Sequence, residues 1–171
     1  AIEFENSAEM WLMKNDPAVI AYADYRDEFA SDDFAFVAWS HPQGALSEEN
    51  LAMTAALVER VERVDGVLRV TALTNMEEIR GRGDTLEVAP LLDPPLDEAA
   101  QAAFLRRLLE DPLYEGTVIS RDGRSTTMAV KISGSDEDLA VRMATMDRVK
   151  AVFASEPEMH FYVAGMTEFD S

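Results

Sequence analysis

The chain contains no cysteine, which excludes disulfides, thiolate metal sites and cysteine nucleophiles. Its two histidines, His41 and His160, stand far apart and alone in the sequence. They predict no catalytic or metal cluster, and we assign both a structural or surface role. No apolar run reaches the roughly 18 residues that a membrane-spanning helix needs. We therefore expect that nothing within these 171 residues crosses a bilayer.

Basic residues are also scarce. Only 15 lysines and arginines stand against 33 acidic residues, and the resulting net charge of −18 is spread along the chain. Because nucleic acids bind proteins through Lys and Arg contacts to phosphate, we expect neither nucleic acid nor an anionic lipid surface as a partner. Two interpretations of the acidity stay open: solubility, which we favour, and a cation-binding face.

Sequence signatures of catalysis are missing. There is no G-x-S-x-G motif, and the glycine-rich loop Gly81-Arg82-Gly83 lacks a P-loop lysine and a strand-turn-helix context. The acidic run at 136–138 lacks the spacing of a calcium loop and suits the first turn of a helix. We thus predict no catalytic residue, no metal, no cofactor and no enzyme activity. Carboxylates distant in sequence could still form a pair in space.

The apolar pattern predicts alternating strands and helices. Residues 34–39 are typical of a strand, a helix starts at the N-cap Ser47 and stops at Asp65-Gly66, and residues 67–73 form the next strand. The remaining expected elements are a helix from Asp16-Pro17, an edge strand at 86–91, a helix at 96–110, and a hairpin of strands 117–121 and 125–133 around Asp122-Gly123. They are followed by a helix from Ser135 to Pro157 and a strand at 159–165. In that last helix we expect these residues to be buried: Leu139, Met143, Met146, Val149 and Phe153.

The order of these elements predicts an α+β fold. It is β-α-β, an insertion, and then β-β-α-β, which closes as a four-stranded sheet with two helices on one face. This is the ferredoxin-like arrangement. We divide the chain into an N-terminal segment and helix at 1–33 and a ferredoxin-like core at 34–171, with an insertion at about 76–112.

Side-chain alternation assigns residues to the two faces of this sheet. We expect Phe34, Phe36 and Ala38 on the helix-covered face, together with Phe161 and Val163 of the last strand. The opposite, open face would then carry Trp39, Thr71, Tyr162, Thr127, Ala129, Arg69 and Lys131. A face that is this apolar and lacks a covering layer is typical of a binding surface.

Two segments resemble motifs of the resistance–nodulation–division (RND) exporter superfamily. Val67-x-x-Val70-x-x-Leu73-Thr74-Asn75-Met76 is similar to its V-x-x-V-x-S-L-T-N stretch, and residues 111–132 are similar to its D-P-x-x-x-G-x-L-I-S-x-D-G-x-x-T hairpin. The similarity is greatest to the branch of the mycobacterial large membrane proteins, hopanoid exporters and Patched-like proteins. Asn15-Asp16-Pro17 and Val163-Ala-Gly165 resemble the segments beside the first and second transmembrane helices.

The resemblance implies a porter domain, the periplasmic loop between the first two transmembrane helices of a proton-driven exporter in the bacterial inner membrane. We accordingly expect the parent chain to continue into about 20 apolar residues on both sides. The implied cargo is hydrophobic or amphipathic, such as a sterol- or hopanoid-like lipid. Implied protein partners are the second porter loop and a periplasmic accessory protein. The proton-coupling residues would lie in the membrane helices, so no family catalytic residue is carried over.

Two hypotheses follow for the function of the domain. In the first, it binds apolar cargo through the candidate residues Trp39, Thr71, Asn75, Tyr114 and Tyr162. Asn75 also suits hydrogen bonding at the end of a strand, which we favour over ligand contact. In the second hypothesis, the open face only docks the second porter loop or an accessory protein and does not contact cargo.

Overall fold

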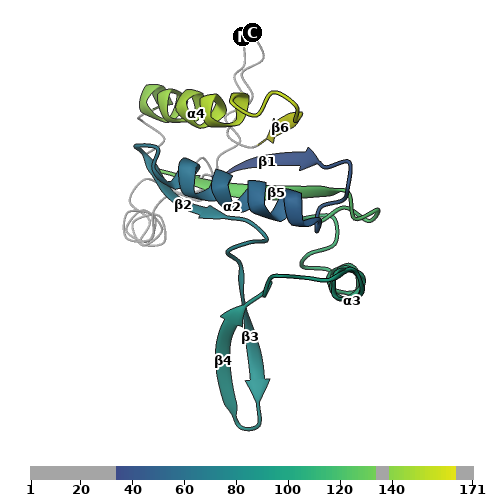
Figure 1. Ribbon diagram of the computed structural model, residues 1–171. Helices are drawn as coiled ribbons and strands as arrows, with labels where there is room; N and C mark the ends of the chain where they lie inside the picture. Colours follow the sequence, from purple (N-terminus) through teal and green to yellow (C-terminus); the bar gives the residue numbers. More distant parts are fainter. Residues whose placement is uncertain (1–33, 134–138, 165–171) are drawn as a thin grey trace, which may run out of the picture. The chain divides into compact units, whose positions relative to one another are not determined.

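A computed structural model describes residues 34–133 and 139–164, all within one compact unit that spans Asp33–Ser171. The helix expected from Asp16-Pro17 and the expected helix start at 135–138 lie outside the described residues. The described elements are β1 (Phe34–Ser40), α2 (Glu48–Glu62), β2 (Val67–Thr71), β3 (Glu77–Arg82), β4 (Thr85–Pro90), α3 (Glu98–Glu110), β5 (Ser125–Ile132), α4 (Leu139–Ala154) and β6 (Phe161–Ala164) (Figure 1).

The main sheet has four strands in the order β2-β5-β1-β6. Strand β5 is antiparallel to both β1 and β2, and β6 is antiparallel to β1. Strands β1 and β2 therefore run in the same direction with β5 between them. This is the split β-α-β arrangement of a ferredoxin-like fold, so the fold class predicted from the element order is confirmed.

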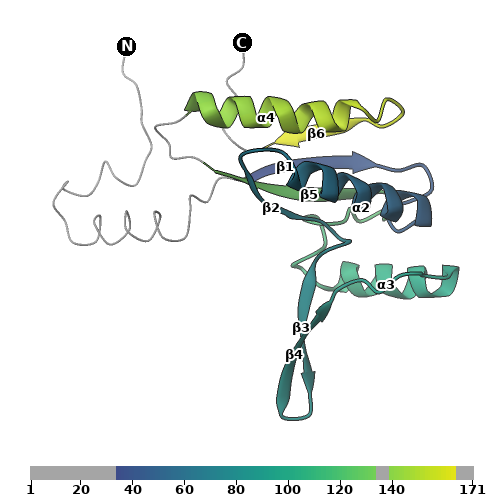
Figure 2. The same cartoon turned by 60° about the vertical axis from the view of Figure 1, so that its left-hand side comes forward.

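Helices α2 and α4 lie beside the main sheet (Figure 2). Buried side chains of both helices and of the sheet form one hydrophobic core. Ser47 caps the first turn of α2 by accepting a hydrogen bond from the Asn50 N–H, as its position before an apolar periodic stretch predicts. Gly66 turns the chain from α2 into β2 at a φ of +93°. A Cβ at that position would lie only 2.5 Å from Thr145 Oγ1 of α4, so the glycine also permits close packing.

The buried face of α4 differs from the expected one. Met146 is buried as predicted, as are Val149 and Phe153, but Leu139 and Met143 are 40% and 53% exposed. Arg142 and Thr145 complete the buried stripe instead. Apolar residues flank this stripe on both sides, so hydrophobicity alone does not determine which side faces the sheet.

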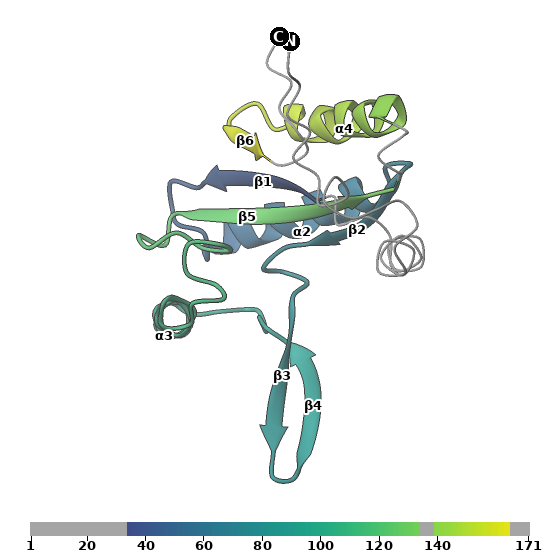
Figure 3. The same cartoon turned by 180° about the vertical axis from the view of Figure 1, so that it is seen from behind.

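The insertion contains an antiparallel hairpin, β3–β4, followed by α3 (Figure 3). The sequence predicted only β4 and a loop at 81–84; in fact Gly81 and Arg82 belong to β3, and the turn is Gly83-Asp84. Strand β3 was not predicted because most of its residues are charged, so its sequence shows no alternating apolar residues that would be buried. Buried residues Leu73, Leu91, Leu108 and Ile119 lie in a second hydrophobic cluster, which joins the insertion to the start of α2.

The expected hairpin before β5 is shorter than predicted. Its turn is present, with Gly123 at a φ of +70°, but residues 117–121 form only isolated bridges, of which one joins Ile119 to Thr126. The register explains the difference. Strand β2 already pairs with the second half of β5, and β1 occupies the other edge, so only the first residues of β5 remain available to pair with this segment.

Candidate functional site

The register of β1 overturns the expected position of Trp39. Trp39 lies opposite Phe161 on β6, and both side chains point to the helix-covered core, with ring centroids 5.6 Å apart. Trp39 is only 1% exposed, so its assignment to the open face is wrong. Phe34 and Phe36 consequently point the other way. Alternation separates the two sets of side chains correctly, but both sets are aromatic, so the pattern does not show which set is inside.

The open face of the sheet, as the described strands define it, carries these residues: Phe34, Phe36, Ala38, Ser40, Arg69, Thr71, Ser125, Thr127, Ala129, Lys131, Tyr162 and Ala164. Thr71 and Tyr162 lie there as predicted. Tyr162 is 65% exposed and Phe36 is 45% exposed, which makes them its prominent aromatic groups. Tyr162 lies opposite Ala38, which is two residues from Phe36 on β1. The two aromatic residues therefore lie on the same face of two adjacent strands.

The charge of the open face is opposite to that of the chain. Although the chain has 33 acidic residues, none of the residues named above for the open face is Asp or Glu. Arg69 and Lys131 lie opposite each other in the β2–β5 register. The Lys131 ammonium lies 5.6 Å from the ring centroid of Phe34, within the range of a cation–π contact. The open face is therefore apolar with cationic groups.

The other two candidate residues, Asn75 and Tyr114, do not lie with the aromatic residues of the open face. The Asn75 side chain accepts a hydrogen bond from the Ala72 N–H at 2.7 Å and donates one to the Val70 carbonyl at 2.8 Å. These bonds confirm the strand-end role that the sequence suggested for Asn75. Tyr114 lies in the turn after α3, where it packs partly buried against the second hydrophobic cluster.

A groove that sequence reasoning missed lies beside α2. It has a volume of about 350 Å³ and is lined by Ala52 and Ala55 of α2, by Thr74, and by the segment around Pro94-Pro95. We call it the α2 groove. The Pro-Pro break was the one signal in the sequence, and it marked a loop without indicating that the loop borders a cavity.

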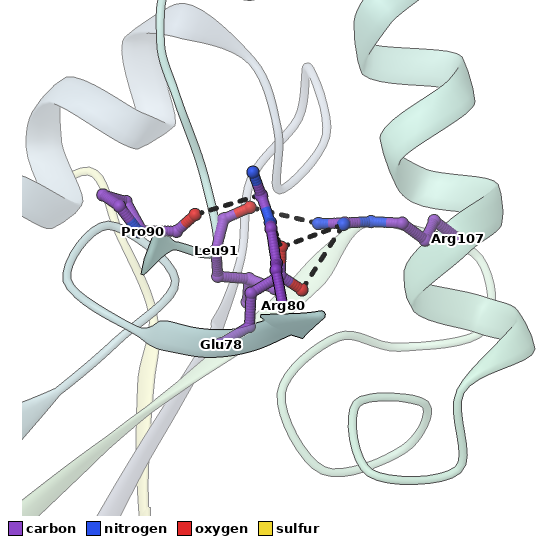
Figure 4. A network of polar contacts seen from close by, with 5 residues as sticks. All are labelled: Glu78, Arg80, Pro90, Leu91 and Arg107. Carbon is purple, nitrogen blue, oxygen red and sulfur yellow. Dashed lines mark hydrogen bonds and ion pairs between the residues drawn. The ribbon is translucent and has the colours of Figure 1, made fainter. Parts of the chain in front are cut away.

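Three charged side chains join the hairpin to α3 (Figure 4). Glu78 of β3 forms ion pairs with Arg80 and, at 3.1 Å, with Arg107 of α3. Arg107 also donates a hydrogen bond to the Leu91 carbonyl at 3.1 Å. Partial burial raises the pKa of Glu78, but the hydrogen bonds and charges of the two arginines outweigh it and hold that pKa below its usual value.

The chain matches no protein-family model and no curated protein sequence. Among the described helices, none is long and apolar enough to cross a membrane. Within residues 34–133 and 139–164, no three His, Cys, Asp or Glu side chains are grouped so as to hold a metal ion. The arrangement of the open face and the α2 groove is thus the basis for a functional conclusion.

Proposed function

We propose that this chain is a cargo-binding porter domain of an RND-type exporter. Its cargo is hydrophobic or amphipathic, such as a sterol- or hopanoid-like lipid, and it leaves the bacterial inner membrane on the periplasmic side. The observation that carries the proposal is the open face, where Phe36 and Tyr162 are exposed among strand residues of which none, in the described part of the chain, is acidic. The resemblance of residues 67–76 and 111–132 to RND motifs supports the same function.

The physical basis of binding is burial of the two exposed rings. Apolar surface removed from water contributes roughly 25 cal/mol per Å², so an apolar cargo lying across Phe36 and Tyr162 is favoured. Arg69 and Lys131 lie on the β2–β5 half of the same face. The Arg69 guanidinium would attract a polar or anionic head group, whereas the acidic remainder of the chain would repel it.

The test needs a reporter on the open face. Trp39 is buried, so its fluorescence reports on the core, and we would place a tryptophan at the surface with Tyr162→Trp. Titration with a water-soluble sterol derivative and a short-chain diacyl lipid should give a saturable fluorescence change. Phe36→Ser should weaken binding by about tenfold, equivalent to about 1.4 kcal/mol.

A matched control is Leu113→Ser, which alters a leucine that is 74% exposed but lies outside the open face. This variant should bind like the parent protein. Absence of saturable binding by every lipid would reject the cargo proposal. Equal losses of affinity in Phe36→Ser and Leu113→Ser would mean that binding is not located on the open face.

The β3–β4 hairpin favours a second candidate function, the docking of another protein. Ile79, Leu86 and Val88 lie on one face of the hairpin and are 70%, 80% and 62% exposed. Glu78 and Arg80 lie on the other face. An exposed apolar patch of this kind is typical of a protein interface. Protection of the hairpin amides from hydrogen exchange on addition of the second porter loop, without any lipid binding, would favour docking.

A further inference from the structure

The β3–β4 hairpin has two open edges. Within the described part of the chain, neither of its strands pairs with a third strand. Five of the six residues of β3 are exposed, and so are five of the six residues of β4. A lone two-stranded hairpin is marginally stable in water, and an exposed edge strand readily pairs with another chain. The edges of the hairpin are therefore places where a further strand can add.

The backbone of β3 shows which of its residues face the open edge. The Leu91 N–H donates a hydrogen bond to the Met76 carbonyl at 2.8 Å, so these two residues form a hydrogen-bonded pair at the base of the hairpin. Hydrogen-bonded and non-hydrogen-bonded pairs alternate along antiparallel strands. Glu77, Ile79 and Gly81 therefore belong to the non-hydrogen-bonded pairs, and their N–H and C=O groups point to the open edge of β3.

The charges along β3 match those of a second, antiparallel copy of the same strand. Glu77 and Glu78 lie at its start, whereas Arg80 and Arg82 lie at its end. A two-fold axis at Ile79 places Glu78 of each copy opposite Arg80 of the other. An axis at any other residue of β3 places two glutamates or two arginines opposite each other, and like charges in opposite positions are destabilising. The sequence of β3 is thus complementary to itself in one register.

Strand β4 has no such match with itself. Its one charged residue is Glu87, and Pro90 at its end has no N–H to donate. Pairing through β3 would instead give a four-stranded sheet in which the apolar residues of both copies lie on one face, namely Ile79, Leu86 and Val88. Three or more strands with a hydrophobic face are more stable than a single hairpin.

We propose that the chain forms a two-fold symmetric dimer in which β3 pairs with β3 of a second copy, centred on Ile79. The two Ile79 residues exchange N–H···O=C hydrogen bonds. Glu78 already forms ion pairs with Arg80 and Arg107 of its own chain, and it gains Arg80 of the other copy. The pairing involves no residue of the open face, so it does not depend on the proposed cargo binding.

A single introduced cysteine tests the register, because the chain contains no other cysteine. Opposite residues of a hydrogen-bonded pair have Cα atoms about 5.5 Å apart, which is within the range of a disulfide. Under mild oxidation, Ile79→Cys should form at least tenfold more disulfide-linked dimer than Val88→Cys. Val88 is the matched control, since it is 62% exposed on the same hairpin face but belongs to β4. Equal cross-linking of the two variants would overturn the proposal.

Exchange of charges tests the contact between Glu78 and Arg80. Sedimentation velocity of the 171-residue chain in 0.15 M salt, which screens the net charge of −18 beyond roughly 8 Å, should show a concentration-dependent dimer. Arg80→Glu and Glu78→Lys each place like charges opposite each other, so each alone should dimerise at least tenfold more weakly. Their equimolar mixture should regain the dimer, because opposite charges then meet at both contacts.

The matched control is Arg106→Glu, which makes the same change of charge at an exposed position of α3 and should dimerise like the parent chain. Circular dichroism checks that each variant is folded. A parent chain that stays monomeric at every concentration would overturn the proposal. An equal loss of the dimer in Arg106→Glu, or a mixture that does not regain it, would do the same.

Discussion

The indole Nε1 of Trp39 donates a hydrogen bond to Asn50 Oδ1 at 2.9 Å, in the interior between β1 and α2. The Asn50 amide group in turn donates to the Ala45 carbonyl at 2.7 Å, so one buried side chain connects the strand, the following loop and the helix. This contact fixes the direction of every side chain in β1. With Trp39 inside, Phe34 and Phe36 must point to the open face.

Asn50→Leu should destabilise the domain by about 2 kcal/mol, because it leaves the Trp39 N–H buried without a partner. Urea unfolding measures the change. Trp39→Phe removes the same donor, so the double variant should cost clearly less than the sum of the two single variants. Additive costs would show that the hydrogen bond does not couple the two residues.

Adjacent residues of β1 test the corrected face assignment. Val37 is fully buried and Phe36 is 45% exposed, although both are apolar. Val37→Ser should cost about 3 kcal/mol because it buries a hydroxyl and removes packing, whereas Phe36→Ser should change stability by less than about 1 kcal/mol. Thermal unfolding of the two variants checks this. A larger loss in Phe36→Ser would restore the original assignment.

The sequence was sufficient for the order of elements and therefore for the ferredoxin-like topology. Ser47 and Gly66 marked the ends of α2, and Asp122-Gly123 marked a turn, because caps and turns depend on local chemistry. The face of β1 was not predictable in the same way. It depends on pairing with β5 and β6, which are distant in sequence, and on a hydrogen bond to Asn50 that no local pattern indicates.

The candidate site was predicted only in part for the same reason. Thr71 and Tyr162 were placed correctly because each has a polar or amphipathic side chain that alternates with a clearly apolar one. Tyr114 was associated with them on the basis of the hairpin, but it packs with the insertion. The α2 groove depends on contact between α2 and a segment some 40 residues away, and sequence periodicity contains no information about such a contact.

The turn at Gly123 should tolerate substitution less well than the turn at Gly83. Both glycines have positive φ, +70° and +66°, so alanine is strained at both positions. At Gly123 a Cβ would also lie 2.8 Å from Leu105 Cδ2 of α3, whereas nothing lies within 4 Å at Gly83. Gly123→Ala should therefore cost about 2 kcal/mol and Gly83→Ala about 1 kcal/mol. Equal costs in urea unfolding would contradict the packing contact.

Acid should loosen the link between the hairpin and α3. Because the folded state holds the pKa of Glu78 below its ordinary value of 4.5, the ion pairs stabilise the fold above that value, and their contribution is lost as pH falls through the folded pKa. Hydrogen exchange of the β3–β4 amides, corrected for intrinsic rates, should accelerate several-fold as the pH falls below 4.5 and through the folded pKa of Glu78. Glu78→Gln should show this acceleration already at pH 7. Glu77→Gln, on the opposite hairpin face, should behave like the parent protein.

Thr74→Val should stabilise the protein by about 1 kcal/mol, because it removes a buried hydroxyl that has no hydrogen-bond partner among the described residues. Thr54 is the matched control, since its buried hydroxyl donates to the Asn50 carbonyl at 2.7 Å. Thr54→Val should be destabilising by a similar amount. Thermal unfolding without ligand measures both variants. A lower melting temperature for Thr74→Val would mean that the free protein already pairs this hydroxyl.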